Sequence, residues 1–348
     1  MHNKEKQTFL RHQQNDLRVV RVDDSAAWDA FVCARAGHPL QLTGWARVKE
    51  SVGWRSERLF VQDPDGVVIA GAQVLFRRVP WPFCQMAYIP RGPVVADGML
   101  ASALDALQHY LRRNHRLLYV LVEPASEKAS LPAGWKKSKS GILLSRTLIL
   151  DLTKTQETLL ADITRKRRYD IRKSTQLHPD IRPVQSPEEV AQCLQVYQET
   201  AKRDGFHLHE AAYYQAIFTY LQQHSQMVAV WNEAGQPIAF TWLAVTPQIA
   251  FELYGGMTSE GQQRRANFAL KWWCITYAQS QGVQQYDFNG LLNDGITTFK
   301  KSFASHENQL IGSFEYSLSP WYLLWRYALP WVRKFYRTLR SARRLVRR

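Results

Sequence analysis

Hydrophobic and polar residues along the first third of the chain change pattern at short, regular intervals. Apolar and polar residues that alternate one by one predict strands, and apolar residues three or four positions apart predict helices. The run DPDG at 63–66 separates two alternating stretches and predicts the turn of a hairpin. The expected elements are a strand at 17–22, helices at 26–36 and 45–52, hairpin strands at 58–62 and 67–76, an extended segment at 87–95, a helix at 100–113 and a strand at 117–123.

The same order of elements returns in the second half of the chain. After an expected loop at 134–140 and strand at 142–150, the pattern predicts helices at 187–202 and 210–223, hairpin strands at 228–231 and 237–245, an extended segment at 249–257, a helix at 267–279 and a strand at 285–289. Residues 17–123 and 181–289 therefore share one order although they share little sequence. We expect a duplicated α/β unit with mixed sheets covered by helices, which resembles the GNAT acyltransferase fold occurring twice in one chain. The expected domains are 15–150, 151–316 and a C-terminal tail at 317–348.

Residues 156–177 (QETLLADITRKRRYDIRKSTQL) lie between the two units and predict one amphipathic helix. Its apolar face carries Leu159, Leu160, Ile163, Ile171 and Leu177, and the cations that surround Tyr169 on the other face are Arg165, Lys166, Arg168, Arg172 and Lys173. Arg167 falls on the apolar side, where its charge requires a buried partner or a charged ligand. Because Asp170 is the only acid of this helix after Asp162, ion pairs within the helix cannot neutralise its positive charge. The helix is either a solvated surface helix or a contact for a polyanion.

Composition limits where the protein works. The length of 348 residues suits two domains that each bury a core. The four cysteines are scattered without metal-ligand spacing, which favours a reducing compartment and no metal site. The N-terminus has no apolar signal-peptide core, and no apolar run is long enough to span a membrane. We expect a cytoplasmic monomer.

The C-terminal end concentrates the positive charge. Residues 321–348 hold eight Arg, one Lys and no acid, and so contribute nine of the fifteen net positive charges. Apolar residues from Ala328 to Val346 share one helical face and Arg333 to Arg347 another, with Trp321 and Trp325 upstream. This pattern is typical of an interfacial helix on anionic lipid, here at the inner face of the plasma membrane. The alternative is that the start of the tail packs on the first domain and only the basic end is free.

The stretch 285–303 (QYDFNGLLNDGITTFKKSF) carries the strongest candidate for chemistry. On a helical wheel Ile296, Phe299 and Phe303 form one apolar stripe that contains Lys300, whereas Lys301 faces solvent. A lysine directed at an apolar wall is unusual. The non-catalytic alternative is that the Lys300 stem packs on this wall while its ammonium reaches water, an arrangement called snorkelling.

The segments that precede the expected helices at 100–113 and 267–279, which are equivalent in the two units, argue against acyl-CoA as a donor. GNAT enzymes bind the CoA pyrophosphate on a glycine-rich loop that opens a helix. Residues 95–99 (VADGM) and 260–267 (EGQQRRAN) lack the paired glycines of such a loop. We therefore expect another activated acyl group and no cofactor.

Five motifs in order resemble the Fem family of non-ribosomal peptidyltransferases, which build peptidoglycan interpeptide bridges. They are TRKRRYDIR at 164–172, YIPRGPVV at 88–95, LYGGM at 253–257, YDFNG at 286–290 and FKKSF at 299–303, within a resemblance that covers residues 38–315. The resemblance implies two GNAT-like domains, no metal and no CoA. It also implies transfer of an amino acid from aminoacyl-tRNA to the stem-peptide amine of a peptidoglycan precursor, either lipid II or its UDP-linked form. No long heptad segment is present, so the chain resembles the compact members, and Ala304 stands where the family often has Gly.

The resemblance assigns roles at the transfer site that agree with the chemistry of ester aminolysis. Lys300 would stabilise the oxyanion that forms on the aminoacyl carbonyl. Phe299 would form the apolar wall that excludes water. Tyr254 would donate a hydrogen bond to the acceptor or intermediate, or serve only as a sheet aromatic. Asp287 would orient the attacking amine, or only pair within the sheet edge.

The resemblance also implies binding sites for the two substrates. Lys49 and Arg203 match positions that bind the phosphates of the acceptor, although each could be an ordinary helix-end cation. Arg91 is a further candidate, which its turn between Pro90 and Gly92 explains nearly as well. The cations of 165–173 would contact the acceptor stem of tRNA through phosphates.

Two other functions remain open. One is a GNAT-type acyltransferase that moves an acyl group from CoA or a carrier to a polysaccharide or lipid. The other is a membrane- or RNA-binding protein that keeps the fold without the chemistry. Transfer that is lost on ribonuclease treatment would support the aminoacyl-tRNA-dependent function over the CoA-dependent one.

Overall fold

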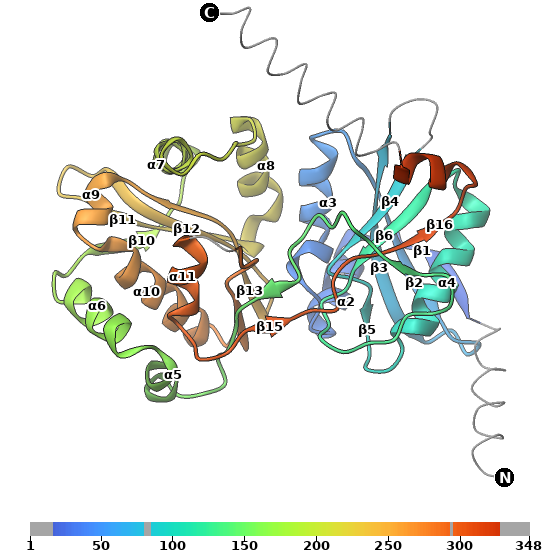
Figure 1. Cartoon of the computed structure of the whole chain (residues 1–348), viewed down its shortest axis with the longest axis horizontal. Coiled ribbons are helices and arrows are strands. Elements are labelled where there is room, and N and C mark those ends of the chain that lie inside the picture. Colours follow the sequence, from blue (N-terminus) through green and yellow to red (C-terminus); the bar gives the residue numbers. More distant parts are fainter. Residues whose placement is uncertain (1–16, 80–84, 293–294, 328–348) are drawn as a thin grey trace, which may run out of the picture.

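The computed structural model describes residues 17–79, 85–292 and 295–327, which form two α/β domains side by side (Figure 1). The elements of the first half are β1 (Arg18–Arg21), α2 (Ser25–Ala34), η1 (Pro39–Gln41), α3 (Thr43–Glu50), β2 (Arg55–Gln62), β3 (Val68–Arg78), β4 (Gln85–Pro90), β5 (Val94–Val95), α4 (Leu100–Asn114), β6 (Tyr119–Glu123), β7 (Lys136–Lys137), β8 (Arg146–Thr147) and β9 (Ile149–Asp151). Those of the second half are α5 (Gln156–Asp162), α6 (Arg165–Thr175), β10 (Asp180–Pro183), α7 (Pro187–Asp204), α8 (Ala211–Leu221), η2 (Gln222–His224), β11 (Ser225–Trp231), β12 (Pro237–Val245), β13 (Ile249–Met257), α9 (Ser259–Gln263), α10 (Ala266–Ser280), β14 (Gln285–Asp287), α11 (Gly295–Lys301), β15 (Asn308–Gln309) and β16 (Phe314–Ser317).

Domain 1 is built on a mixed sheet in the order β1-β2-β3-β4-β6-β16-β7, with β5 paired to β3. β4 and β6 run parallel, and the other neighbours are antiparallel. The apolar stripe of α4 explains its position, because Leu104, Leu107 and Leu111 pack with strand residues in one buried cluster. The parallel pair at the centre leaves its carboxyl ends next to the start of α4.

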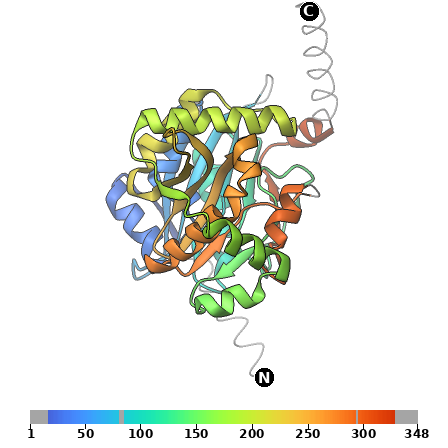
Figure 2. The same cartoon turned by 90° about the vertical axis from the view of Figure 1, so that its left-hand side faces the viewer.

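Domain 2 repeats this plan in the order β10-β11-β12-β13-β14-β9, with β13 and β14 parallel. α10 packs with one buried cluster of this sheet, and α7 and α8 pack with another. In the end-on view of Figure 2, α7 crosses one side of the domain and α5 and α6 lie on the opposite side. The predicted duplication is confirmed, since β1–β6 and β10–β14 occur in the same order with equivalent helices.

Each sheet is extended by strands from outside its own repeat, β7 and β16 in domain 1 and β9 in domain 2. β9 precedes domain 2 in the sequence and pairs antiparallel with β14. β16 follows domain 2, yet it returns to domain 1 and pairs antiparallel with β6. The expected division placed residues 151–316 in the second domain, whereas β16 pairs with β6 of domain 1 and satisfies its otherwise open edge.

Helices α3 and α8 form a close contact between the two domains. Trp45 and Val48 of α3 share one buried cluster with Ile217 and Leu221 of α8. A Cβ atom at Gly44 would lie 2.4 Å from the carbonyl oxygen of Tyr220, so only glycine permits this approach. The inter-domain contact is therefore a packed core that fixes the domains against each other.

Three expected elements are interrupted. The segment 87–95 is not continuous, because Arg91 adopts φ 51° and the chain turns between β4 and β5. The strand at 142–150 is reduced to β8 and β9. The single helix at 156–177 is two helices, because Ile163 is extended (ψ 139°) and is buried between α5 and α6. Each break depends on contacts distant in sequence, which local periodicity does not report.

The last described residues, 321–327, are helical and pack on domain 1. Tyr322 and Trp325 are buried in a cluster with Leu118 and Tyr119. The predicted amphipathic tail from Ala328 onward lies outside the described residues. Within the described ranges, no helix is long and apolar enough to cross a membrane.

Candidate active site

Lys300 reaches the turn that follows β14 in domain 2. Its ammonium donates hydrogen bonds to the carbonyl oxygens of Phe288 (2.6 Å), Gly290 (3.2 Å) and Asn289 (3.3 Å). Asn289 adopts φ 61°, a left-handed conformation that Asn tolerates better than most residues, and so turns the chain there. The half-buried cation is thereby held beside the carboxyl end of β14.

The expected stripe around Lys300 is only partly present. Phe303 is fully buried, but it lies beyond the end of α11, and Ile296 is 47% exposed. The wheel assumed one continuous helix, whereas α11 is short and its start faces solvent. The prediction for Lys301 is confirmed, because that side chain is partly exposed and pairs with Glu307.

Phe299 is part of an aromatic cluster, as the apolar-wall role requires. Its ring centre lies 5.5 Å from that of Phe268 on α10 and 5.1 Å from that of Phe303. Arg167 of α6 covers the other side, with its guanidinium 4.2 Å from the ring centre of Phe268 and 5.3 Å from that of Phe299. The sequence predicts that Arg167 needs a buried partner or a charged ligand, and the structure pairs it with the buried Asp170 of the same helix at 3.0 Å.

Asp287 is buried directly before this turn. It accepts hydrogen bonds from the Thr147 hydroxyl and from the Asn289 N–H (2.7 Å). Burial raises the pKa of Asp287, and these hydrogen bonds and the charges of Arg91 and Lys300 oppose the rise. These hydrogen bonds support the turn, and a direct role toward an incoming amine stays a prediction.

Arg91 brings a cation of domain 1 close to the transfer segment. Its side chain is buried, and its Nη2 donates to the carbonyl oxygen of Leu144 at 2.9 Å. Arg91 forms no ion pair with any residue in the described part of the chain, although its charge acts on Asp287 and on His38. A buried guanidinium without a carboxylate partner is suited to an anionic ligand.

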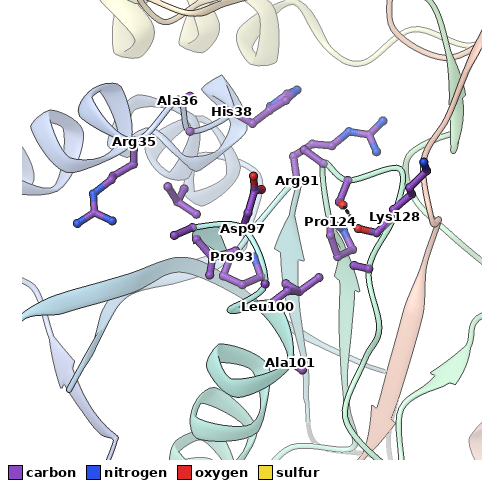
Figure 3. Close-up of a pocket in the computed structure, with 18 of the residues that line it drawn as sticks. Arg35, Ala36, His38, Arg91, Pro93, Asp97, Leu100, Ala101, Pro124 and Lys128 are labelled. Atoms are coloured by element: carbon purple, nitrogen blue, oxygen red, sulfur yellow. Dashed lines mark hydrogen bonds between the residues drawn. The ribbon is translucent and has the colours of Figure 1, made fainter. Parts of the chain in front are cut away.

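A cavity of about 350 Å³ lies beside Arg91 at the carboxyl ends of β4 and β6. Figure 3 shows Asp97, from the loop before α4, and Leu100, the first residue of α4, on one side and Pro124 with Lys128 on the other. This is the edge of an α/β sheet at which ligands commonly bind. Domain 1 thus has room for part of a substrate next to a buried cation.

The phosphate-binding candidate Lys49 and the candidate Tyr254 are joined across the domain interface. Lys49 donates to the Tyr213 hydroxyl at 2.8 Å, and Tyr213 is hydrogen-bonded in turn to Tyr254. Burial, followed by the nearby charge of Arg77, lowers the pKa of Lys49 to about 8. Its ammonium also lies 4.5 Å from the ring centre of Trp45. The structure therefore brings these two predicted residues together.

Arg203 lies at the end of α7, against the far end of the same strand β13. Its Nη1 donates to the carbonyl oxygen of Met257 at 3.0 Å, and its Nε pairs with Asp204 at 2.9 Å. Tyr254 is three residues earlier on β13. Arg203 is thus on the Lys49–Tyr254 side of domain 2, whereas Arg91 belongs with Asp287 and Lys300.

The predicted RNA-binding cations of α6 divide into two groups. Arg165, Lys166, Arg172 and Lys173 are exposed. Arg168 instead donates to the carbonyl oxygens of Leu160, Ala161 and Ile163 at the end of α5. These bonds satisfy groups that the end of a helix leaves open, so Arg168 stabilises the α5–α6 corner.

Sequence reasoning missed two polar groups. Tyr213 carries no motif, and its contact with Lys49 depends on the docking of α8 against α3. The ion pair between Lys271 and Glu252 is buried beneath β14, where the Tyr286 hydroxyl also donates to Glu252 at 2.7 Å. A lysine on the apolar face of the helix expected at 267–279 was the signal that could have revealed this pair.

Comparisons with known proteins agree with this geometry. The sequence model of the FemAB family matches residues 24–140, 133–234 and 221–329. A lipid II:glycine glycyltransferase of Staphylococcus saprophyticus is 24% identical over 382 residues, which cover 84% of this chain and 91% of that protein. The lipid II:glycine glycyltransferase of Staphylococcus aureus is 24% identical over 386 residues, with the same coverage.

Solved structures confirm the expected fold class. The crystal structure of FemX has a TM-score of 0.79 at 22% identity and covers 89% of this chain and 100% of that one. A tandem GNAT protein from the clavulanic acid biosynthesis pathway has a TM-score of 0.51 at 12% identity and covers 88% of this chain and 99% of that one. The two domains are therefore tandem GNAT-like units with mixed sheets.

Proposed function

The chain belongs to the FemAB family, and we propose that it transfers an amino acid from aminoacyl-tRNA to the stem-peptide amine of a peptidoglycan precursor. The enzyme is a transferase that contributes to the interpeptide bridge. The observation that carries this proposal is the position of Lys300, held by three consecutive carbonyl oxygens where β13 and β14 separate. Relatives named for lipid II favour the lipid-linked acceptor.

The proposed reaction is aminolysis of the ester that joins the amino acid to the RNA. The acceptor amine attacks the ester carbonyl carbon, the C–O bond to the ribose breaks, and the ribose hydroxyl leaves with a proton while an amide forms. A developing oxyanion would replace the two longer hydrogen bonds of Lys300. The ammonium would then stabilise the transition state more than the ground state. The cluster of Phe299, Phe268 and Phe303 would limit access of water to the ester.

The acceptor would lie along the domain interface. Its phosphates would bind Lys49 and Arg203, and Tyr254 and Tyr213 would donate hydrogen bonds nearby. The lowered pKa of Lys49 supports this proposal, because a phosphate would compensate the cost of a buried ammonium. Arg91 and the cavity beside it would hold a further anionic part of the acceptor.

The donor would approach from the side of α6. Arg165, Lys166, Arg172 and Lys173 would contact its phosphates, which position an RNA without reading its sequence. The helix lies against the transfer segment, because Arg167 on its other face donates through Nε to the Ser302 hydroxyl at 2.7 Å.

Peripheral attachment to the inner face of the plasma membrane would place the protein next to a lipid-linked acceptor. Trp321, Leu324 and Tyr327 are exposed on the helical turn that precedes the basic tail, while Tyr322 and Trp325 hold that turn on domain 1. Exposed aromatic and apolar side chains followed by many arginines are typical of binding to anionic lipid. In vesicle co-sedimentation, the full chain should bind phosphatidylglycerol vesicles and a chain ending at 327 should bind less. Equal binding to neutral phosphatidylcholine vesicles would reject the electrostatic part of this proposal.

The test of the function uses purified protein, lipid II and a mixture of aminoacyl-tRNAs. Mass spectrometry should detect lipid II extended by an amino acid, and ribonuclease treatment of the donor should abolish the product. Transfer that survives ribonuclease and requires acyl-CoA would establish the alternative acyltransferase. No product from either donor would favour a binding protein without chemistry.

A further inference from the structure

An exposed tyrosine lies in the middle of the cationic face of α6. The Tyr169 side chain is 55% exposed, and the ammonium of Lys173 lies 5.9 Å from its ring centre. Around it, the side chains of Arg165, Lys166 and Arg172 form neither ion pairs nor hydrogen bonds with any residue in the described ranges. An exposed aromatic ring among uncompensated cations is the surface that proteins present to unpaired nucleotides.

The opposite face of α6 fixes this surface to the transfer segment. Arg167 is bonded to Asp170 on its own helix and to Ser302, two residues beyond Lys300. Asp170 also accepts from Arg265 at 2.7 Å, at the start of α10. In addition, the Thr164 N–H donates to the Ser302 carbonyl oxygen at 3.3 Å. Tyr169 therefore belongs to a helix that has a defined position relative to Lys300.

We propose that Tyr169 is a stacking site for an unpaired base at the aminoacylated end of the donor RNA, flanked by cations that bind the adjacent phosphates. This inference rests on the proposed function and adds the part of the RNA that is bound. The aminoacyl ester has to reach Lys300, so the nucleotides next to it lie close to α6. A duplex keeps its bases stacked on one another, whereas unpaired nucleotides can place a base on an aromatic side chain.

The two kinds of contact have different experimental signatures. Phosphate contacts release counterions, so removal of one reduces the slope of log affinity against log salt by about 0.7 for a single strand. Stacking on Tyr169 releases no counterion. Loss of its ring should therefore lower affinity and leave the salt slope unchanged.

The experiment measures fluorescence anisotropy of labelled tRNA with the full-length protein. One RNA is intact, and the other lacks its unpaired 3′ nucleotides. Tyr169→Ala should weaken binding of the intact RNA by about 5- to 100-fold, as removal of a base-stacking ring does. Tyr169→Phe should restore binding, because it keeps the ring. The matched control is Tyr220→Ala, which removes an exposed tyrosine from α8, on the other side of domain 2.

The shortened RNA decides between the possible outcomes. It should bind more weakly than the intact RNA to the unsubstituted protein and equally to the unsubstituted and Tyr169→Ala proteins. Equal losses with both RNAs would overturn the proposal, since Tyr169 would then contact the duplex. The stacking proposal would also be overturned if Tyr169→Ala bound the intact RNA as tightly as the unsubstituted protein does. The proposed function would survive that result if the unsubstituted protein bound the RNA and catalysed transfer. Failure of the unsubstituted protein to bind either RNA would reject both.

Discussion

The two domains differ at the carboxyl ends of their central parallel strands. In domain 1, pairing between β4 and β6 continues to Pro90 and Glu123. The carboxylate of Glu123 accepts hydrogen bonds from the Ile142 N–H (2.7 Å), the Leu143 N–H (3.1 Å) and the Ser313 hydroxyl (2.7 Å), and from Tyr88. These donors are all neutral, and they tie two loops to the strand ends.

In domain 2, pairing between β13 and β14 ends earlier, at Phe251 and Asp287. β13 continues along β12 alone, and the chain after β14 turns at Asn289 toward α11. The equivalent position is thus occupied by the ammonium of Lys300. Among the buried carboxylates of this domain, Glu252 lies under the strands and is paired with a cation, whereas Asp287 ends β14 and accepts hydrogen bonds from Thr147 and Asn289.

This difference indicates a division of labour within one duplicated fold. A carboxylate saturated by neutral donors has no capacity left for a ligand and stabilises the junction of its loops. A cation whose ammonium is hydrogen-bonded to carbonyl oxygens can respond to negative charge that develops beside it. Function in such folds depends on the segment that follows each strand.

The largest effect should come from removing the cation beneath the strands of domain 2. Lys271→Met leaves the buried carboxylate of Glu252 without its ionic partner. We expect a loss of about 3–5 kcal/mol in the free energy of unfolding, measured by urea denaturation. The double variant Lys271→Met, Glu252→Leu should recover most of it, since an apolar pair leaves no buried charge. A single-variant loss below about 1 kcal/mol would mean that water reaches the pair.

Lys300→Met should instead affect the reaction. Loss of the charge beside the developing oxyanion should lower kcat by about 100- to 1000-fold. The matched control is Lys301→Met, which removes only the partly exposed pair with Glu307 and should leave kcat nearly unchanged. Both should be measured in the lipid II transfer assay, with unfolding curves to show that the protein is folded. Near-normal transfer by Lys300→Met would contradict the view that the strand ends of domain 2 carry the chemistry and those of domain 1 do not.

The pH dependence of acceptor binding tests Lys49 at the interface. Its pKa of about 8 means that the free protein loses this positive charge above pH 8, whereas a bound phosphate favours the protonated form. Affinity should therefore be constant below pH 8 and fall about tenfold per pH unit well above it. Isothermal titration calorimetry with the UDP-linked precursor measures this. Lys49→Met should bind weakly at every pH, and a slope that persists in this variant would assign the effect to another group.

Local sequence patterns predicted most of the elements and their duplication, because periodicity is a local property. They failed where distant residues decide the outcome. Ile163 ends α5 within an apolar cluster, and β16 returns to domain 1 because β6 has an open edge. The Lys49–Tyr213 contact joins residues 164 positions apart, and no spacing rule reports it. Lys300 was found by motif and wheel together, but the carbonyl oxygens that hold it belong to a turn visible only in the structure.

The smallest expected effect concerns the strand ends of domain 1. Tyr88→Phe removes one of the hydrogen-bond donors to Glu123 and leaves those from Ile142, Leu143 and Ser313 in place. The free energy of unfolding should fall by about 1.5 kcal/mol, the value of a bond to a charged acceptor. Transfer activity per folded molecule should remain within about twofold, a change in barrier below about 0.5 kcal/mol, because the ring is kept and no reacting group is assigned there. A 100-fold loss of kcat without loss of stability would place chemistry in domain 1 as well. The two strand ends would then act as one composite site, with Arg91 as the cation shared between them.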